Sequence, residues 1–540
     1  MKLKILLFLL FCYCTSTAQV VYEPLYRSVY AYLSRISQRG IINLDDVVQP
    51  IARKDIAQHL HQLQQNDEQL TPLEKKELVF YLKEYTQDLT LLYRDSSLKE
   101  TTKVKFLKYS NNDRFRFLSS QDKLFTINFQ PIFGYQFGIT NGSHSLTHRW
   151  SGFWAYGAIG KNFGYSVDFR AHQEDGTGVD SSKSFTPETG VLARYRENGL
   201  EYSEVKATLS YNWKWGNITV GKDYMPIGYG TNGKIIISTK APSFPLIRLD
   251  IKPVKWFSFN YAHIWLNSNV VDSTNIRASG IPKVYQISDV PKYMATHSLI
   301  FTPFKGLKVL LGESIIYNNQ VQLAYMTPIL FFRAVSHYQG ELSRSNTVSN
   351  SQIFAQVSSR NHIPHTHLYA SFFIDELSLR NKNRNQTAYN LGVSLTDFPI
   401  KNLFISSDYT RVRPYTYIHF IPAQTYRNSN YNIGHWIGDN ADQWTNEIQY
   451  RIKRGLDIKM NYRLIRKGTV GNGIGQQDLS LKSDFLWGQK KYLQSIEVYL
   501  NYEIIHDLFV KMGYQNLNYD GSFIQTPTKN IFSLSTNYGF

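Results

Sequence analysis

Residues 496–504, IEVYLNYEI, give the clearest indication of the fold class, because their apolar and polar side chains alternate without interruption. Isoleucine, valine, leucine and tyrosine occupy the even positions, whereas glutamate, tyrosine and asparagine occupy the odd positions. A period of two residues is typical of a β-strand with one apolar and one polar face. The same alternation recurs in LDIKMNYRL at 456–464 and in YSVDF at 165–169. The sequence therefore predicts an all-β protein.

The connections between these segments distinguish a membrane barrel from a soluble sandwich. Tight turns are predicted at 160–162, 216–217, 304–306, 399–401 and 453–455, and long polar links at 173–201, 267–291, 318–351, 412–442 and 468–490. Short turns on one rim and long loops on the other are typical of a transmembrane β-barrel. We therefore predict about eighteen antiparallel strands in residues 124–540, with both ends on the short-turn side. Pro131 removes one ladder hydrogen bond, so we expect a break or a shifted register in the first strand.

Composition agrees with a barrel and excludes a bundle of membrane helices. The 540 residues contain 19% charged and 15% aromatic side chains, and no run of 18 apolar residues occurs. Mean hydropathy is −0.33, which a barrel with alternating strands allows. The last segment, FSLSTNYGF at 532–540, alternates and ends in Phe540. A final strand that ends in phenylalanine resembles the signal read by the barrel assembly machinery of Gram-negative bacteria, which we expect as a partner.

Residues 1–18 are predicted to be an export signal. Lys2 and Lys4 precede an apolar run, and the small residues before Gln19 suit cleavage after Ala18. The only two cysteines, Cys12 and Cys14, lie inside this segment. The mature protein is therefore expected to have no disulfide, no thiolate zinc site and no iron–sulfur cluster.

Residues 19–92 carry a helical pattern and are predicted to form a small domain. Apolar residues recur at helical spacing in three segments, and the third opens with a capping box in which Thr71 and Glu74 bond reciprocally around Pro72. Because both barrel ends are expected on the short-turn side, this domain is predicted to lie in the periplasm. Residues 93–123 are predicted to be a connector with one short strand.

The chain is basic, with a formal net charge of +17. Such a charge favours polyanionic partners, although it also serves solubility. An exported chain meets outer-membrane lipid, lipopolysaccharide and acidic surface polysaccharide rather than nucleic acid. The polar strand faces carry charges of both signs, which we expect to pair across a filled interior rather than to line a channel. These residues are Asp168, Arg170, Glu447, Arg451, Asp457, Lys459, Arg463, Glu497 and Glu503.

Several short motifs resemble nucleotide, metal or hydrolase sites, but the residues around them argue against each of these sites. GYGTNG at 228–233 fits G-x-G-x-x-G, but no crossover helix follows, so a turn in a surface loop is expected instead of a nucleotide site. His365 and His367 lack a third metal ligand nearby. No G-x-S-x-G occurs, and GSHS at 142–145 has no third orienting group. We predict no catalytic residue, no metal and no cofactor.

Several longer stretches resemble the Wzi-type capsule assembly family. They are YAYLSRISQRGII at 30–42, PIARKDIA at 50–57, VGKDYMPIGYGTNGKIIIST at 220–239, APSFP at 241–245, LAYMTP at 323–328, FFIDEL at 372–377, YTRVRPYTYIH at 409–419 and YNIGH at 431–435. The last three are most similar to the Bacteroidota branch, which includes members associated with gliding motility. The resemblance implies an outer-membrane barrel of about eighteen strands, a periplasmic helical domain and a lectin-like role in holding capsular polysaccharide. The loops differ from those of enterobacterial members, so no particular sugar is implied.

Candidate binding residues follow from the chemistry of acidic sugars, which flat aromatic rings and cationic groups recognise together. They are Arg411, Arg413, Tyr415, Tyr417, His435 and Trp436 in one long loop, with Tyr229 and Arg333 in two others. A membrane barrel also places tyrosine and tryptophan at its lipid interfaces, which is the structural alternative. The function that we predict is non-catalytic binding and organisation of surface polysaccharide. A general diffusion porin, or a surface component of gliding motility, stays open as an alternative.

Overall fold

The computed structural model describes residues 20–93, 103–110, 113–122, 124–343, 349–376, 385–471, 484–521 and 528–539. The predicted export signal at 1–18 and the terminal Phe540 lie outside the described residues.

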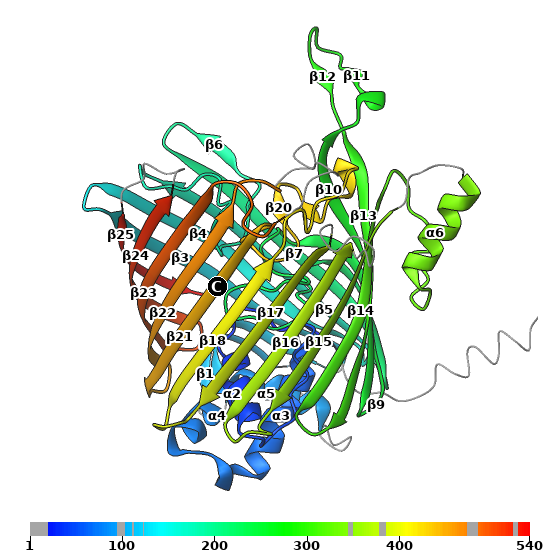
Figure 1. The fold of residues 1–540 in the computed structure, drawn as a ribbon. Helices are drawn as coiled ribbons and strands as arrows, with labels where there is room; N and C mark the ends of the chain where they lie inside the picture. The colour runs from blue at the N-terminus through cyan, green and yellow to red at the C-terminus, as the bar shows by residue number, and fades with distance from the viewer. Residues whose placement is uncertain are drawn as a thin grey trace, which may run out of the picture.

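Eighteen antiparallel strands form a closed barrel (Figure 1). They are β3 Phe125–Thr140, β4 His144–Ile159, β5 Phe163–Asp175, β7 Gly199–Trp213, β8 Gly216–Asp223, β9 Phe244–Val254, β10 Phe257–Val271, β13 Asp289–Phe304, β14 Leu307–Asn318, β15 Asn350–Arg360, β16 Thr366–Glu376, β17 Gln386–Thr396, β18 Leu403–Val412, β21 Ala441–Lys453, β22 Leu456–Gly468, β23 Lys490–Ile505, β24 Leu508–Gly521 and β25 Lys529–Tyr538. Each strand pairs with the next along the chain, and β25 closes the barrel on β3. The predicted fold is confirmed.

The connections also follow the prediction. Turns such as 160–162, 305–306 and 454–455 join strands at one end, called here the short-turn end. Long connections, among them 176–198, 272–288 and 413–440, lie at the other end, called the long-loop end. The connection 224–243 is also long and starts from that end, but it was not among the predicted links. One connection at the long-loop end is short, the turn at 141–143.

Pro131 does not break the first barrel strand, contrary to expectation. β3 continues through Pro131, which lies opposite Phe153 of β4. On its other edge β3 pairs with β25 only from Phe133 onward, and with a different strand, β2 (Asp113–Gln121), only as far as Phe129. Pro131 falls between these two partners, where no neighbouring strand requires its missing N–H.

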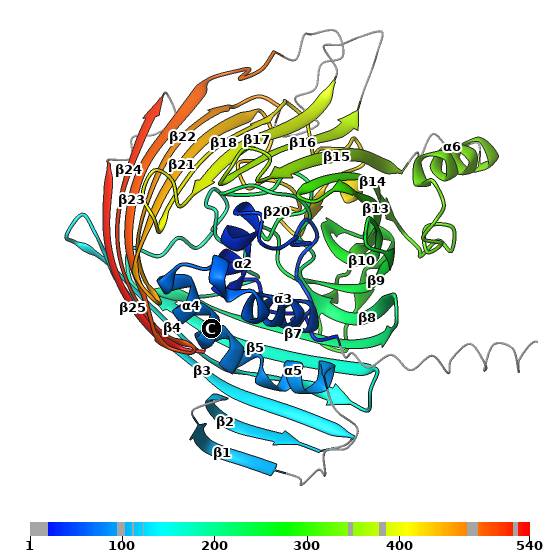
Figure 2. The ribbon, with the colours of Figure 1, turned by 90° about the horizontal axis from the view of Figure 1, so that it is seen from below.

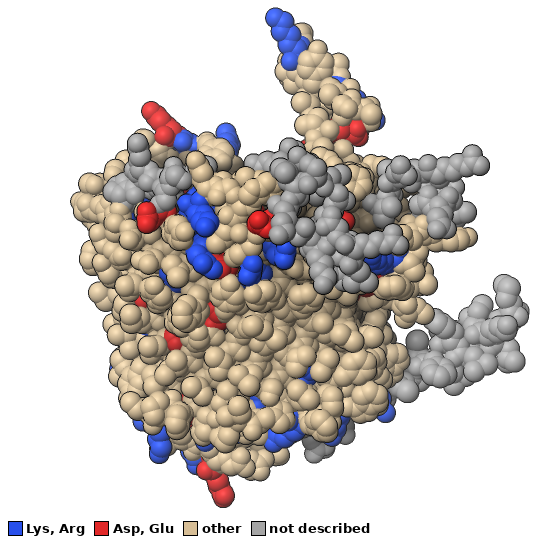
Figure 3. All heavy atoms as spheres, viewed as in Figure 1, with Lys and Arg blue, Asp and Glu red and all other residues tan. Residues whose placement is uncertain are grey.

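Strand β21 illustrates how the wall separates apolar side chains outside from polar side chains inside. In β21 the outward Trp444 and Ile448 are about half exposed, whereas the inward Thr445 and Glu447 are buried. Figure 3 shows lysine and arginine gathered towards both ends of this face, with few charges in the band between them. An uncharged band around a closed barrel is the surface that lipid covers.

Four helices occupy the mouth of the barrel at the short-turn end (Figure 2). They are α2 Val29–Gln38, α3 Arg53–Gln65, α4 Pro72–Glu84 and α5 Thr86–Leu92. The predicted capping box is present, with Glu74 N donating to Thr71 Oγ1 at 3.3 Å and Thr71 N donating to Glu74 Oε2 at 2.7 Å. The predicted third helix is divided at Tyr85, where α5 begins in a new direction. None of the helices in the described ranges is long and apolar enough to cross a membrane.

Ion pairs and hydrogen bonds attach this helical domain to the inner wall. The Arg360 guanidinium of β15 donates to both carboxylate oxygens of Asp46, at 2.9 and 2.7 Å. Arg451 of β21 pairs with Glu77 of α4 at 2.9 Å. Because these contacts come from well-separated strands, the helices are docked in the barrel rather than tethered below it.

The connector contains more structure than predicted. β1 Lys103–Ser110 and β2 form an antiparallel hairpin, and β2 extends the sheet by pairing with the first residues of β3. Arg114 of β2 forms ion pairs with Glu84 of the helical domain and with Asp507 in a short turn of the barrel. The alternation of arginine and phenylalanine at 114–117 is the sequence signal for β2.

A backbone segment, as well as side chains of the wall, fills part of the interior. The segment 224–243 folds inward, and Ile235, Ile236 and Ile237 are completely buried. GYGTNG therefore lies inside the barrel and not in a surface loop. Its three glycines have φ values of +105°, +155° and +134°, and a Cβ on Gly233 would lie 2.5 Å from His435 Nε2. The glycines therefore allow the backbone to pass close to neighbouring groups such as the His435 ring.

Most of the predicted inward charges pair, whereas Asp457 and Glu503 accept hydrogen bonds from Asn501 and Ser28. Arg170 contacts Asp168 at 2.8 Å, Lys459 contacts Glu447 at 2.5 Å, and Arg463 pairs with Glu497. Buried charges of opposite sign at these distances form a network that fills the interior.

Candidate functional site

The loop 413–440 folds back into the long-loop end and forms the base of the site. Its tyrosines bond to the buried segment 224–243, with Tyr417 Oη donating to Ile235 O at 2.8 Å and Tyr426 Oη to Ile236 O at 3.0 Å. The two tyrosine rings stack with centroids 5.6 Å apart. These contacts hold the loop in one position.

A cavity of about 460 Å³ lies between this loop, the loop 176–198 and the wall strands β22, β23 and β24. Its lining combines aromatic and basic side chains with few acidic ones. The aromatic members are Phe185, Tyr431, Trp436, Tyr492 and Tyr519, and the charged members are Lys240, Arg427, Lys467, Lys491 and Asp439.

Buried hydrogen bonds fix the position of several lining residues. Trp436 Nε1 donates to Asn232 O at 2.7 Å, and its ring lies 5.3 Å from that of Phe185. Lys467 Nζ donates to the carbonyls of Ile437 and Asp439 at 2.9 and 2.7 Å. The walls of the cavity are therefore largely formed before any ligand arrives.

Lys240 joins the two loops. Its ammonium donates to the carbonyls of Lys183, Thr186 and Glu188 in loop 176–198, at 2.9 and 2.8 Å for the last two. It also lies 5.3 Å from the ring centroid of Tyr431. Burial lowers the pKa of Lys240 to about 8.

Among the described residues that line the cavity, Asp439 is the single acidic one. Burial raises the pKa of Asp439 to about 6, against the opposing effect of Lys467 and Arg427. Its Oδ2 atom is buried and has no hydrogen-bond partner among the described residues. A donor from a ligand, such as a sugar hydroxyl, would satisfy this atom.

The predicted binding residues do not form one cluster. Trp436 lines the cavity. Tyr415, Tyr417 and His435 are buried in the same loop, with 2%, 1% and 0% exposure, and contribute to its packing. Burial lowers the pKa of His435 to about 3, so its ring is neutral.

The other four predicted residues do not line this cavity. Arg413 and Arg333 lie in the connections where they were expected, whereas the positions expected for Arg411 and Tyr229 are corrected. Arg411 belongs to β18 on the outer face of the rim, where it lies over the ring of Phe485 at 3.6 Å, and Arg413 begins the loop. Tyr229 is buried in the interior, where its Oη donates to Asp46 at 2.5 Å. Arg333 is on α6 (Phe332–Ser343), outside the barrel.

The sequence pattern missed most of the cavity. Phe185 and Lys240 lie in connections that fold into the barrel, and no periodic pattern in the sequence indicates that they do. Three further lining residues, Lys491, Tyr492 and Tyr519, are at the ends of strands. There the sequence does not show whether a side chain points into the barrel or away from it. The only signal for the site was the aromatic content of loop 413–440, which pointed to Trp436.

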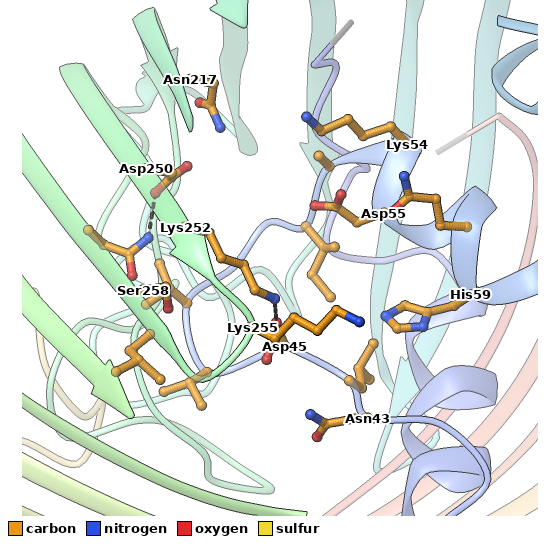
Figure 4. A pocket seen from close by; sticks show the side chains of 18 of the residues that line it. Asn43, Asp45, Lys54, Asp55, His59, Asn217, Asp250, Lys252, Lys255 and Ser258 are labelled. Atoms are coloured by element: carbon orange, nitrogen blue, oxygen red, sulfur yellow. Dashed lines mark hydrogen bonds and ion pairs between the residues drawn. The ribbon is translucent and has the colours of Figure 1, made fainter. Parts of the chain in front are cut away.

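A larger cavity of about 1150 Å³ lies at the short-turn end, between α3 and the wall strands β8 to β10 (Figure 4). Asp45 on this side pairs with Lys252 and Lys308, and Asp250 pairs with Arg248 at 2.9 Å. Figure 4 shows Lys255 extending into the space towards His59. Only Tyr22 and Trp215 among its lining residues are aromatic. Because aromatic rings stack on sugar rings, the more aromatic cavity at the long-loop end is the better candidate for binding sugars.

The two histidines considered for metal binding have other partners. His367 Nε2 is 2.8 Å from Ser358 Oγ, and His365 Nδ1 is 3.0 Å from Thr396 O. Within the described ranges, no group of three histidine, cysteine, aspartate or glutamate side chains is arranged to hold a metal ion.

Comparison with solved structures identifies similar barrels. An Escherichia coli outer-membrane protein, Wzi, described as a carbohydrate-binding β-barrel involved in group 1 capsule assembly, has a TM-score of 0.57 and 11% identity, covering 97% of this chain and 100% of its own. OprD of Pseudomonas aeruginosa has a TM-score of 0.42 and 10% identity over 76% of this chain and 94% of its own. OccAB2 of Acinetobacter baumannii has a TM-score of 0.43 and 11% identity over 76% and 97%.

Sequence comparison supplies the family. No curated protein matches the chain. The model of the family "Capsule assembly protein Wzi" matches residues 127–526, which include almost all of the barrel. This confirms the resemblance seen in the sequence motifs: the chain belongs to the Wzi family of capsule assembly proteins.

Proposed function

We propose that the protein is a non-catalytic barrel of the outer membrane that binds acidic surface polysaccharide in the cavity at the long-loop end. The observation that carries this proposal is the lining of that cavity, where four basic residues face one acidic residue among five aromatic rings. Aromatic faces stack on sugar rings, and guanidinium and ammonium groups pair with uronate carboxylates. Family membership supports a polysaccharide as the ligand.

The same proposal assigns the orientation. The long-loop end faces the cell exterior, where surface polymer is met, and the helical domain faces the periplasm. Tyr415, Tyr417 and His435 hold the loop in shape, and Trp436 contacts the polymer. Arg411 and Arg413 lie at the rim, where a chain leaving the cavity passes, and contribute less.

Retention of the purified protein on immobilised polygalacturonate tests the proposal. Replacing Arg427 and Lys491 together by glutamine removes two of the four positive charges. At about 0.5–1 kcal/mol for each exposed charge contact, affinity should fall roughly 5- to 30-fold. Retention by the unmodified protein should also weaken between low and physiological ionic strength.

Lys283→Gln is the matched control, because Lys283 is exposed on a distant loop of the same end. Its retention should equal that of the unmodified protein, and a neutral dextran column should retain none of the proteins. Equal retention of the double variant and the control would remove the cavity from polymer binding. Heat-modifiable migration of each variant verifies that the barrel has folded.

A further inference from the structure

A polar patch faces outward from the barrel wall at a depth where lipid is expected. His297 of β13 and Glu313 of β14 are opposite each other in the ladder, and their Nε2 and Oε1 atoms are 3.1 Å apart. Leu310 and Ile316 of β14 belong to the interior core, so Glu313, at the alternate parity, points outward. Glu313 lies six residues from Leu307, or about 16 Å above the short-turn end for a strand tilted by about 40°. An apolar band about 25 Å tall would include it.

The long connection after β14 returns over this patch. Figures 1 and 2 both show α6 outside the barrel ring, beside β14. The backbone N–H of Phe332 donates to Glu313 Oε1 at 2.7 Å. Tyr261 Oη of β10 donates to Tyr325 O at 2.9 Å. As a result the Glu313 side chain is only 4% exposed, and Tyr325 and Phe332 are fully buried against the outer wall.

The opposite face of this connection is apolar and uncovered. Leu323 and Ile329 are 81% and 84% exposed, and Phe331 and Tyr338 are more than half exposed. From Asn319 to Tyr338 the chain contains a single charged side chain, that of Arg333. This surface continues the lipid-facing exterior of the barrel, where Leu299 and Leu311 are also exposed.

The backbone of this connection also suits an apolar environment, in which each unpaired N–H costs several kcal/mol. Hydrogen bonds within local turns pair several of its backbone N–H groups. Tyr325 N donates to Gln322 O at 3.1 Å, Met326 N to Leu323 O at 3.1 Å, and Leu330 N to Thr327 O at 3.2 Å. At the start of α6, Glu313 accepts hydrogen bonds from Phe332 N at 2.7 Å and from Arg333 N at 3.5 Å.

From these observations we propose that residues 319–338 are embedded in the outer half of the membrane, beside the barrel, and contact lipid acyl chains through Leu323, Ile329, Phe331 and Tyr338. The occupant of this surface is lipid because the polar face is turned inward onto the wall and the apolar face extends the wall outward. The segment thus shields His297 and Glu313 from the acyl chains.

Fluorescence quenching tests the proposal in the mature protein. Cys12 and Cys14, the only cysteines, lie in the predicted export signal, so a single cysteine placed at Ile329 can be labelled with bimane. Ile281→Cys is the matched control, because Ile281 is 65% exposed on the loop joining β11 (Arg277–Ala278) and β12 (Tyr285–Gln286), which rises away from the barrel in Figure 1. Both proteins are reconstituted into dioleoylphosphatidylcholine vesicles, with or without phosphatidylcholine that carries a nitroxide on its acyl chain.

The nitroxide lipid should reduce the fluorescence of the Ile329→Cys probe at least twofold, and aqueous iodide should have little effect on it. The Ile281→Cys probe should respond in the opposite way. Strong quenching of the Ile329→Cys probe by iodide alone would overturn the proposal. Shielding of that probe from both quenchers would assign the surface to another protein chain and would overturn it equally.

Discussion

Replacement of Asp46 by alanine should release the helical domain from the inner wall. Asp46 accepts two hydrogen bonds from Arg360 and one from Tyr229, and the Asp46 and Arg360 side chains are 7% and 4% exposed. Without Asp46 the guanidinium stays buried and unpaired. Loss of one partner of such a pair costs about 3–5 kcal/mol, which raises the population of the undocked state roughly 100- to 4,000-fold.

Amide hydrogen exchange measures this change directly, because two backbone hydrogen bonds cross the docked interface. Gly228 N donates to Val47 O at 2.9 Å, and Gln49 N donates to Pro226 O at 3.0 Å. Exchange at Gly228 and Gln49 should accelerate by the same factor in Asp46→Ala, while amides of β22 and β23 keep their protection.

The double variant Asp46→Ala with Arg360→Met is the control that isolates charge. It removes both ions, and an apolar replacement of similar length should restore protection to within about 1 kcal/mol of the original. If Asp46→Ala leaves exchange at Gly228 unchanged, or if the double variant opens as readily as the single one, the buried pair does not hold the domain.

Four further results are expected. Burial raises the pKa of Asp439 to about 6, so this carboxyl becomes neutral as the pH falls from neutral to about 5 and retention on polygalacturonate should rise, a dependence that Asp439→Asn should abolish. Planar-bilayer recordings of the whole mature chain should show little conductance, with more after deletion of 19–92, whereas large steady channels from the intact protein would favour a porin. Glu313→Ala should destabilise the outer-wall contact of α6 by about 1–3 kcal/mol, seen as faster exchange at the Phe332 amide; unchanged exchange there would show that Glu313 does not hold the helix. An epitope at Gly280 should be accessible on intact cells and one at Lys161 should not, and the reverse pattern would invert the proposed orientation.

The barrel could be predicted from the sequence because strand pattern and loop length are local properties. Alternation in stretches such as 496–504 identifies strands, and the contrast between short and long connections identifies a barrel. The position of Pro131 shows the limit, since its tolerance depends on where two different strands end on β3. Where those strands end is set by strand pairing across the barrel, and the residues next to the proline in the sequence do not indicate it.

The candidate site was less predictable for a related reason. Loop 413–440 was recognised as aromatic, but whether a tyrosine points into a cavity or into packing depends on the inward course of the segment 224–243. Tyr417 bonds that segment, whereas Tyr431 lines the cavity. Tyr229 was expected near the surface and lies beside Asp46, because no periodic pattern distinguishes a plug from an external loop.

The hairpin of β1 and β2 has a consequence for how the cylinder is sealed. The last strand, β25, reaches β3 only between Phe133 and Thr140, and β2 already occupies the edge of β3 from Thr126 to Phe129. A final strand could otherwise slide by two residues and keep every side chain on its proper face. Here a slide towards the short-turn end would collide with β2. The hairpin thus limits how far the closing strand can shift towards the short-turn end.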